Sequence, residues 1–225
     1  MATGTQRLAG KVAVITGGSG GIGLATGRLF AAGGAQVVLV DLDGAALRAA
    51  AADIGGSSVS HQVADVSDEA QMRGALQAAL AQHGRIDVLF CNAGTEGRIG
   101  PLTEMPVEDF DRVMAVNVRG VFLGLKHALP LMQQQGSGSI IITSSVAGFR
   151  GAAHLAPYAT SKHAVVGLMR SAVLETGASG VRINTIHPSP IETRMMRAIE
   201  HGRAPGAEAA ARQMISSRIP AGRYG

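Results

Sequence analysis

The run Val12-Ala-Val-Ile-Thr-Gly-Gly-Ser-Gly-Gly-Ile-Gly23 joins a short apolar segment to a glycine-rich turn and to the start of a longer segment. The apolar segment is rich in Val and Ile, which is typical of a buried strand. The glycines allow the backbone to turn tightly and to approach a pyrophosphate, which binds at the N-terminus of the following helix. The run therefore predicts a strand, a phosphate-binding turn and a helix.

Outward from this run, apolar segments alternate with longer helix-like segments along the chain. We expect buried strands at residues 12–16, 37–41, 59–64, 87–91, 139–143 and 181–187. We expect helices at residues 22–32, 43–54, 67–83, 107–134 (broken within its length) and 158–176, with Ser67-Asp-Glu69 as a helix start. Six such alternations predict an α/β fold, a doubly wound parallel sheet with helices on both faces, in a single domain spanning residues 1–225.

Residues 188–218 differ from the rest because they are polar, contain no strand pattern and carry several prolines. They follow the last predicted strand, and ligands of such sheets bind beyond the carboxyl ends of the strands. We therefore interpret this segment as a substrate lid. Four arginines of the lid would suit an anionic substrate, although a solvated helix face is the simpler interpretation; they are Arg194, Arg197, Arg203 and Arg212.

Asp41 ends the second predicted strand, 18 residues after Gly23. A carboxylate at this spacing is typical of one that binds the adenosine ribose of a dinucleotide. Together with the absence of a basic residue in the turn, Asp41 favours NAD over NADP. The alternative is a structural turn in which Asp41 merely caps the following helix.

The same turn also fits the pattern G-x-S-x-G, with Ser19 at its centre, which in hydrolases carries a nucleophilic serine. His187 and His201 follow later in the chain and could serve as its base. This alternative would leave no role for a second motif, formed by Tyr158 and Lys162.

Tyr158 and Lys162 are four residues apart, so a helix places them on one face, one turn apart. A lysine ammonium beside a phenol favours the phenolate and is expected to lower the pKa of Tyr158 from its usual value near ~10. Such a phenol can exchange a proton with an alcohol. Ser145 lies thirteen residues before Tyr158, a spacing that favours it over Ser144 as a partner of the phenol.

Composition excludes several other classes of protein. The charged fraction is 16%, the net charge is +4 and no Lys/Arg run occurs, which argues against nucleic-acid binding. The single Cys91 excludes a disulfide framework and a thiolate zinc cluster, and no metal-binding motif is present. No apolar stretch suggests a membrane span or a leader peptide, so we expect a cytoplasmic protein with a small-molecule substrate.

Taken together, these residues resemble the short-chain dehydrogenase/reductase family over nearly the whole chain. The matching pieces are Thr16-Gly-x-x-x-Gly-Ile-Gly23, Asp65-Val66, Asn92-Ala-Gly94, Asn117 in Val116-Asn-Val118, Ser145 and Tyr158-x-x-x-Lys162. The resemblance implies that Tyr158 is the acid/base, that Ser145 holds the reacting oxygen and that Lys162 grips the nicotinamide ribose. It also implies that Asn117 binds a water that links Lys162 to solvent.

The resemblance further implies contacts to the cofactor along the chain. The residues expected to bind it are Gly17, Ser19, Gly21, Ile22, Gly23, Asp41, Asp65, Val66, Asn92, Ala93, Gly94, Tyr158, Lys162, Pro188, Ile191 and Thr193. Two of the roles that the resemblance implies have simpler alternatives. Asp65 could merely end a strand, and Asn117 could merely form a hydrogen bond to the backbone across a helix bend.

The chain departs from the family pattern at three places. Cys91 replaces the usual Asn and is expected only to pack, while Ser189 replaces the usual Gly after Pro188. The sequence ends at Gly225, where family members usually continue through another helix and strand, so we expect a fragment of a longer chain. The family also implies a homo-oligomer, a tetramer or dimer, in which the helices at 107–134 and 158–176 pack at one interface.

The sequence thus predicts an oxidoreductase that transfers a hydride between NAD and a secondary alcohol or ketone. One alternative is an NADPH-dependent ketone or 3-oxoacyl thioester reductase, which Asp41 disfavours. Another is a nucleotide-binding protein without turnover, which the presence of Ser145, Tyr158 and Lys162 disfavours.

Overall fold

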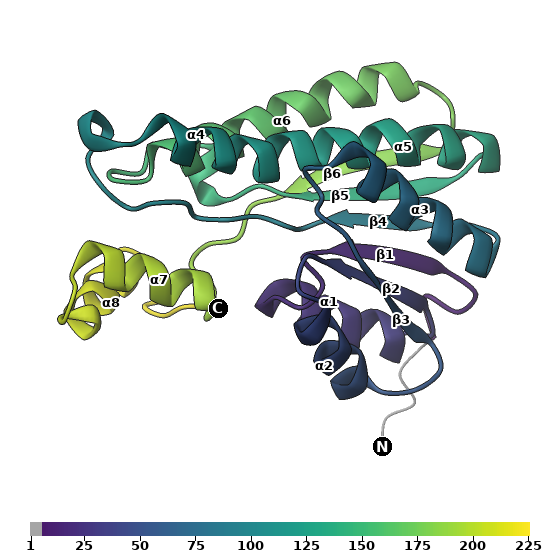
Figure 1. The fold of residues 1–225 in the computed structure, drawn as a ribbon, viewed down its shortest axis with the longest axis horizontal. Coiled ribbons are helices and arrows are strands. Elements are labelled where there is room, and N and C mark those ends of the chain that lie inside the picture. The colour runs from purple at the N-terminus through teal and green to yellow at the C-terminus, as the bar shows by residue number, and fades with distance from the viewer. Residues whose placement is uncertain (1–5) are drawn as a thin grey trace.

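Six parallel strands form a single sheet in the computed structural model, which describes residues 6–225 (Figure 1). The strands lie in the order β3-β2-β1-β4-β5-β6, so the direction of winding reverses between β1 and β4. Their bounds are β1 Val12–Thr16, β2 Gln36–Asp41, β3 Val59–Val63, β4 Val88–Cys91, β5 Gly138–Thr143 and β6 Val181–Ile186. The predicted doubly wound parallel sheet is confirmed, and ligands of such sheets bind at the point of reversal.

The strand register brings the carboxyl ends of the strands to one edge of the sheet. Thr16 pairs with Val40, Cys91 with Ile142 and Thr143 with Ile186. The residues that follow these strands therefore share one end of the molecule, where the predicted site residues belong.

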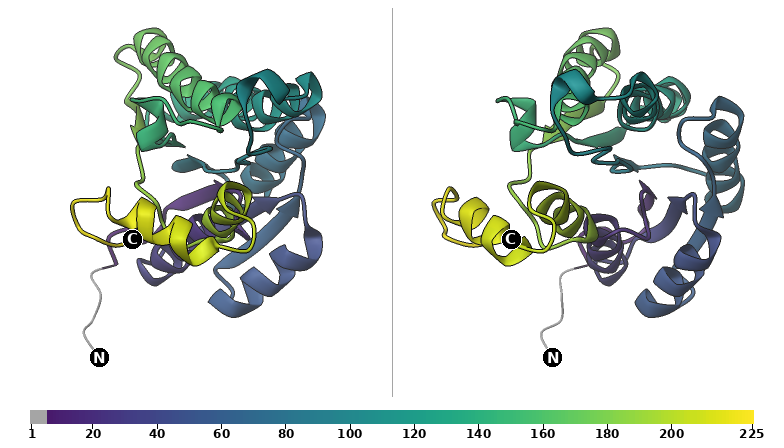
Figure 2. Two further views of the ribbon diagram at one scale, coloured as in Figure 1. Left: turned by 90° about the vertical axis from the view of Figure 1, so that its left-hand side faces the viewer. Right: turned by 60° about the vertical axis from the view of Figure 1, so that its left-hand side comes forward.

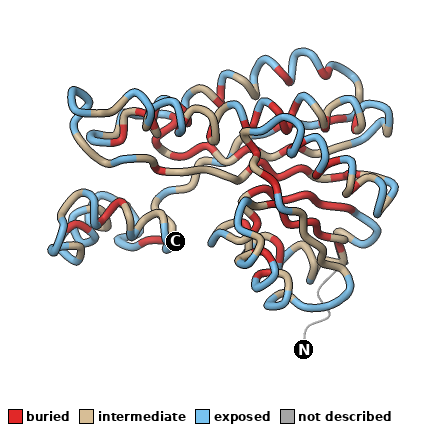
Figure 3. Tube along the Cα trace, in the orientation of Figure 1, coloured by how far each residue is buried: buried red, intermediate tan, exposed pale blue. Residues whose placement is uncertain are grey.

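Helices cover both faces of the sheet (Figure 2). On one face lie α3 (Glu69–His83), α5 (Gly120–Gln135) and α6 (Ala156–Thr176), whose buried side chains join one core cluster. On the other face, α1 (Gly21–Ala32) and α2 (Gly44–Ile54) pack on β1 and β2 around Leu39 and Leu47. The central strands are buried on both faces, as apolar crossover sheets require (Figure 3).

The two edge strands are less buried than the strands between them. The residues of β3 are half-buried or exposed, and those of β6 alternate between buried and exposed positions along Val181–Thr185. Each of these strands pairs with one neighbour only, so one side and part of a face meet solvent. Burial on both faces is therefore confined to the interior of the sheet.

The predicted elements are found, with boundaries shifted by one or two residues at most sites. Asp68 caps α3 by accepting a hydrogen bond from the Gln71 amide at 2.9 Å, so Ser67 does not begin the helix. The break expected within residues 107–134 is a single π-helical turn, η2 (Ala115–Arg119), between α4 (Val107–Met114) and α5. Two short 3₁₀ turns, η1 (Leu102–Glu104) and η3 (Val146–Gly148), complete the loops beyond β4 and β5.

The segment predicted as a lid contains α7 (Arg194–Arg203) and α8 (Glu208–Ser216), which lie beyond the strand ends and away from the sheet (Figure 1). The last two residues return beneath these helices. The Gly225 amide donates to the Pro190 carbonyl at 3.1 Å, and Tyr224 is buried with Arg212 stacked 4.7 Å from its ring centroid. Across residues 6–225, none of the helices has the length and apolar character needed to cross a membrane.

Candidate active site

The glycine-rich turn between β1 and α1 is packed so tightly that side chains would not fit. Gly17 has a φ of +64°, and a Cβ there would lie 2.9 Å from the Cα of Ala93. A Cβ on Gly23 would lie only 2.1 Å from the Gly17 carbonyl oxygen. The first turn of α1 therefore opens into the cavity as bare backbone, which suits a phosphate group.

Asp41 is fixed against this turn. One carboxylate oxygen accepts hydrogen bonds from the Ser19 amide at 3.1 Å and the Ser19 hydroxyl at 2.5 Å, and the other accepts from the Leu42 amide at 2.8 Å. The cap of α2 is Asp43, which accepts from the amides of Ala45 and Ala46. Asp41 is therefore not a helix cap, and that alternative is wrong.

The residues after β3 and β4 line the same cavity. Asn92 ties three strand ends together: its amide nitrogen donates to the carbonyls of Thr16 and Gly17, and its amide oxygen accepts from the Thr143 hydroxyl. Asp65 accepts from the amide and hydroxyl of Ser67 at 2.8 and 2.7 Å. The structure thus brings Asp65, Val66, Asn92, Ala93 and Gly94 to one wall.

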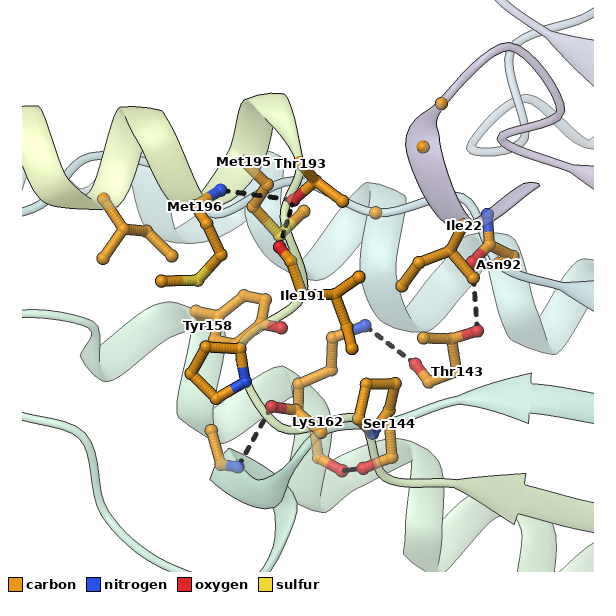
Figure 4. A pocket seen from close by; sticks show the side chains of 18 of the residues that line it. Ile22, Asn92, Thr143, Ser144, Tyr158, Lys162, Ile191, Thr193, Met195 and Met196 are labelled. Carbon is orange, nitrogen blue, oxygen red and sulfur yellow. Dashed lines mark hydrogen bonds between the residues drawn. The ribbon is translucent and has the colours of Figure 1, made fainter. Parts of the chain in front are cut away.

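Tyr158 and Lys162 project from α6 into this cavity (Figure 4). The Lys162 Nζ lies 5.4 Å from the centroid of the Tyr158 ring and donates to the Thr143 carbonyl at 2.8 Å. Ser145 is close enough to act on the phenol of Tyr158, whereas the Ser144 hydroxyl donates to the Lys162 carbonyl at 2.8 Å. The spacing argument for Ser145 over Ser144 agrees with this geometry.

Burial controls the acidity of both groups. The pKa of Tyr158 is raised above its usual value, first because the phenol is buried; the Ser145 hydroxyl opposes this rise and the negative charge of Glu96 adds to it. Burial lowers the pKa of Lys162 to about 8. The expected lowering of the Tyr158 pKa by Lys162 is therefore not found: burial of the phenol is the largest influence on this pKa, and Lys162 is not among the groups that shift it.

Asn117 lies in the π-helical turn η2 and is buried. Its amide nitrogen donates to the Thr95 carbonyl at 2.9 Å and to the Ser161 hydroxyl at 3.0 Å, and its amide oxygen accepts from the Thr95 amide at 2.8 Å. A Cβ on Gly94 would lie 3.3 Å from this oxygen and 3.5 Å from the Lys162 Nζ. Asn117 therefore fixes the loop after β4 beside Lys162, and π-helical turns often occur at functional sites.

Residues of the segment 188–218, predicted as a lid, also line the cavity, whose volume is about 680 Å³. Pro188, Ile191 and Thr193, which we predict to bind the cofactor, line this cavity, and Met195 and Met196 lie beside them (Figure 4). A Cβ on Gly21 would meet the Thr193 methyl group at 2.8 Å, so the start of α7 lies against the turn of α1. Of the four lid arginines, Arg194 and Arg203 line the cavity, whereas Arg197 and Arg212 pair with Glu192.

The hydrolase alternative is wrong. The Ser19 hydroxyl donates to Asp41, not to a histidine. His187 donates through Nδ1 to the Ser145 carbonyl at 3.0 Å, and His201 pairs with Glu208 at 2.7 Å. The predicted packing role of Cys91 is confirmed, because its thiol is buried in the core, where burial raises its pKa to about 12.

Sequence reasoning missed two contributors to the site. The His187 ring stacks on Phe149 at 3.9 Å between centroids and supports the loop that carries Ser145. Glu96 is buried beside the cavity and forms two hydrogen bonds with Arg194. A carboxylate two residues after Gly94, in a loop at the carboxyl end of a strand, was the available signal for Glu96.

The residues of this cavity fit a nicotinamide dinucleotide. The bare backbone of the α1 turn suits the pyrophosphate, Asp41 offers carboxylate oxygens to a ribose, and Lys162 offers an ammonium donor beside Tyr158. These three features line a single continuous cavity.

Comparisons with known proteins agree with this geometry. The family model described as short chain dehydrogenase matches residues 11–204. Levodione reductase from Leifsonia aquatica is 44% identical over 196 residues, which cover 85% of this chain and 73% of that protein. A crystal structure of levodione reductase superposes with a TM-score of 0.95 at 41% identity, covering 97% of this chain and 86% of the other. A crystal structure of NAD⁺-bound xylitol dehydrogenase gives a TM-score of 0.90 at 32% identity, covering 97% and 88%.

Proposed function

This chain belongs to the short-chain dehydrogenase/reductase family, and from that premise we propose that it transfers a hydride between NAD and a secondary alcohol or its ketone, with Tyr158 as the acid/base. Members of the family are oxidoreductases that act on CH–OH groups with a nicotinamide cofactor. One observation carries the proposal. Tyr158, Lys162 and Ser145 meet in the cavity into which the α1 turn and Asp41 also open.

In this proposal, residues of the protein transfer the proton and position the substrate. The Tyr158 phenol gives a proton to the carbonyl oxygen during reduction and takes one from the hydroxyl during oxidation. Ser145 holds the reacting oxygen, because it lies beside the phenol and is itself fixed by the Ala147 amide at 3.1 Å. Lys162 holds the nicotinamide ribose, and Asn117 fixes the backbone next to Lys162. The bound nicotinamide supplies or accepts the hydride.

We further propose that NAD is preferred to NADP. Asp41 brings a negative charge to the end of β2, where it would repel a 2′-phosphate. The turn from Gly17 to Gly23 contains no basic residue that would offset this repulsion. The NAD⁺-bound state of the similar xylitol dehydrogenase supports the same preference.

The substrate class follows from the cavity wall beside Tyr158, which is mainly apolar. Leu155 and Ala147 form it on the sheet side, and Met195, Met196 and Ile199 form it on the lid side. Residues 188–218 act in this proposal as the lid over the substrate. Because methionine side chains adapt to irregular shapes, we propose a compact alcohol or ketone of mostly apolar character.

The test is oxidation of a panel of alcohols with NAD, followed by the absorbance of NADH. Levodione and xylitol belong in the panel because similar proteins carry their names, together with cyclic and open-chain secondary alcohols and matched primary alcohols. We expect turnover of at least one secondary alcohol, or reduction of its ketone, and none of the matched primary alcohol. Binding of NADH without turnover of any member would contradict the proposal.

We also propose a homo-oligomer in the cytoplasm. The face of α4, α5 and α6 supports the first part, since Val107, Phe110 and Phe122 are exposed on it and a groove runs between α5 and α6 at Leu168. The reduced, buried Cys91 is compatible with a reducing compartment. Light scattering on the native protein and on Phe122→Glu tests the assembly; a monomeric native protein would contradict it.

A further inference from the structure

Glu96 is a carboxylate that the proposed chemistry does not use, yet it is only 6% exposed. Burial of a carboxylate is costly unless it is paired. Its partner is Arg194, whose Nη1 and Nη2 lie 3.1 and 3.3 Å from its two oxygens. The two residues are 98 positions apart, so the ion pair joins the loop after β4 to the first residue of α7.

The position of Glu96 is set by the loop that carries it. Both backbone groups of Thr95 are held by Asn117, and the Gly97 amide donates to the Thr95 hydroxyl at 3.2 Å. Gly97 has a φ of +68°, and a Cβ there would lie 2.4 Å from Val113, so the turn that directs Glu96 inward requires glycine. The carboxylate is therefore fixed, and Arg194 comes to it from the lid.

Arg194 joins the cavity lining to Glu96. Its side chain is 73% exposed and lines the cavity, while its guanidinium ends at the buried carboxylate. The same loop contacts the lid at a second point, since Gly202 packs on Ile99. The loop after β4 is thus the part of the main body against which the lid is held.

The negative charge of Glu96 is the smallest of three influences on the Tyr158 pKa, and it favours the protonated phenol. Lys162 faces the phenol from the same helix, Ser145 faces it from η3, and His187 lies behind Ser145. The other charged groups that line the cavity are Asp41, Asp65, Arg150, Arg203 and Arg218. Of the groups named in this paragraph, only Glu96 forms an ion pair with Arg194.

We propose that Glu96 is a positioning residue that couples the lid to proton transfer: its ion pair with Arg194 holds the start of α7 against the loop after β4, and Arg194 in turn balances the charge that Glu96 directs at Tyr158. When the ion pair is formed, the lid is held against the loop after β4, and the charges of Glu96 and Arg194 offset each other near Tyr158. When Arg194 leaves, the uncompensated carboxylate keeps the phenol protonated. This inference rests on the proposed role of Tyr158.

The experiment uses three test variants, Glu96→Gln, Arg194→Gln and the double variant that combines these two substitutions. Each is compared with the control variant Arg197→Gln. Arg197 is a matched control because it lies one turn further along α7, pairs with Glu192 and does not line the cavity. For each protein we would measure kcat/KM for alcohol oxidation against pH, and hydrogen exchange of residues 194–203 without substrate.

In the pH profile of kcat/KM, we expect the inflection of Glu96→Gln to move to lower pH, because the positive charge of Arg194 is then unpaired. The inflection of Arg194→Gln should move to higher pH, and each shift should be about half a pH unit or more. In the double variant the inflection returns to a value between those two, because both charges are gone. Both single variants should raise KM by about three- to tenfold with a smaller effect on kcat, and should speed exchange in α7. Arg197→Gln should change none of these.

If the ion pair were purely structural, the pH inflections of the two single variants would move in the same direction or would not move. Either result overturns the inference. So does an equal effect of Arg197→Gln. If Glu96→Gln folds poorly, Arg194→Lys takes its place, because lysine keeps the charge but loses the paired hydrogen bonds. Arg194→Lys must then keep the native pH inflection, while hydrogen exchange in α7 becomes faster. Tyr158→Phe distinguishes failure of the proposed function from failure of the coupling. If Tyr158→Phe remains active, the proposed function is wrong. If Tyr158→Phe is inactive but the pH inflections of Glu96→Gln and Arg194→Gln do not move, only the coupling is refuted.

Discussion

Ser19 donates two hydrogen bonds to one carboxylate oxygen of Asp41, from its amide at 3.1 Å and from its hydroxyl at 2.5 Å. The second strand of the sheet is thereby fastened to the phosphate-binding turn that follows the first. These two hydrogen bonds hold the Asp41 carboxylate in a fixed position at the cavity wall. In the function we propose, the charge at this point makes NAD bind in preference to NADP.

Asp41→Asn should weaken discrimination between the two cofactors. The amide keeps an acceptor for Ser19 but removes the charge that would repel a 2′-phosphate. Because like charges in contact cost several kcal/mol, we expect the ratio of kcat/KM for NAD over NADP to fall by about ten- to a hundredfold. The measurement is initial rates with both cofactors on one substrate.

Asp43→Asn is the control for Asp41→Asn. It removes the same charge two residues further on, and asparagine still caps α2. The cofactor ratio should stay at the native value. A native protein that already uses both cofactors equally, or an unchanged ratio in Asp41→Asn, would contradict the assignment.

Tyr158→Phe should abolish turnover and leave NADH binding close to native. The ring still fills its place in the cavity, and only the proton-transferring hydroxyl is lost, for which we expect a fall in kcat of about 10²–10⁴-fold. The measurements are steady-state rates and NADH fluorescence. Tyr224→Phe changes the other of the two tyrosines, which is buried beneath α8, and should keep full activity. More than about a tenth of native activity in Tyr158→Phe would show that the acid/base is another group.

The sequence predicted those parts of the site that depend on local spacing. The glycine turn, Asp41 at a strand end and the Tyr158–Lys162 pair each lie within one strand–turn–helix unit or one helical turn, where geometry follows directly from residue separation. The same holds for the sheet, since buried apolar runs separated by helices permit few other topologies.

Other features could not be predicted because they depend on tertiary contacts. The Glu96–Arg194 pair joins residues 98 positions apart, and no periodicity links them. The π-helical turn at Asn117 has the same amphipathic pattern as an ordinary helix, so the sequence suggested only a break. The direction of the Tyr158 pKa shift was predicted wrongly because the depth of burial is not visible from the spacing of two residues.

Asn117→Ala should destabilise the fold as well as the activity. It leaves the amide and the carbonyl of Thr95 without their partner, and each unpaired backbone group costs about 1–3 kcal/mol when buried. Since Thr95 is only half-buried, we expect a loss of about 1–3 kcal/mol in the free energy of unfolding, measured in urea. Asn184→Ala, on the exposed side of β6, should change stability by less than about 0.5 kcal/mol. Equal stability of Asn117→Ala and the native protein would contradict the role of Asn117 in fixing the loop.

Lys162→Met should abolish turnover and weaken cofactor binding, yet stabilise the fold at neutral pH. Burial lowers the Lys162 pKa from 10.5 to about 8. The unfolded chain therefore binds this proton more tightly than the folded chain, so the native protein gains stability as pH rises from about 8 to 10.5 and carries the full penalty below pH 8. That penalty is about 3 kcal/mol, and removal of the hydrogen bond to the Thr143 carbonyl offsets about 1 kcal/mol of the gain.

The net effect of Lys162→Met at pH 7 is then about 2 kcal/mol, which corresponds to a rise in Tm of about 4–8 °C for a chain of this size. Because the native protein loses its penalty at high pH, the difference in Tm between variant and native should shrink between pH 8 and pH 10.5. Calorimetry across this range gives the measurement, and Lys126→Met, which removes an exposed lysine of α5 paired with Glu69, should show no such pH dependence. A variant less stable than the native protein at pH 7, or a difference that grows with pH, would mean that the cavity solvates the ammonium well and that the Lys162 pKa is not lowered in the folded protein.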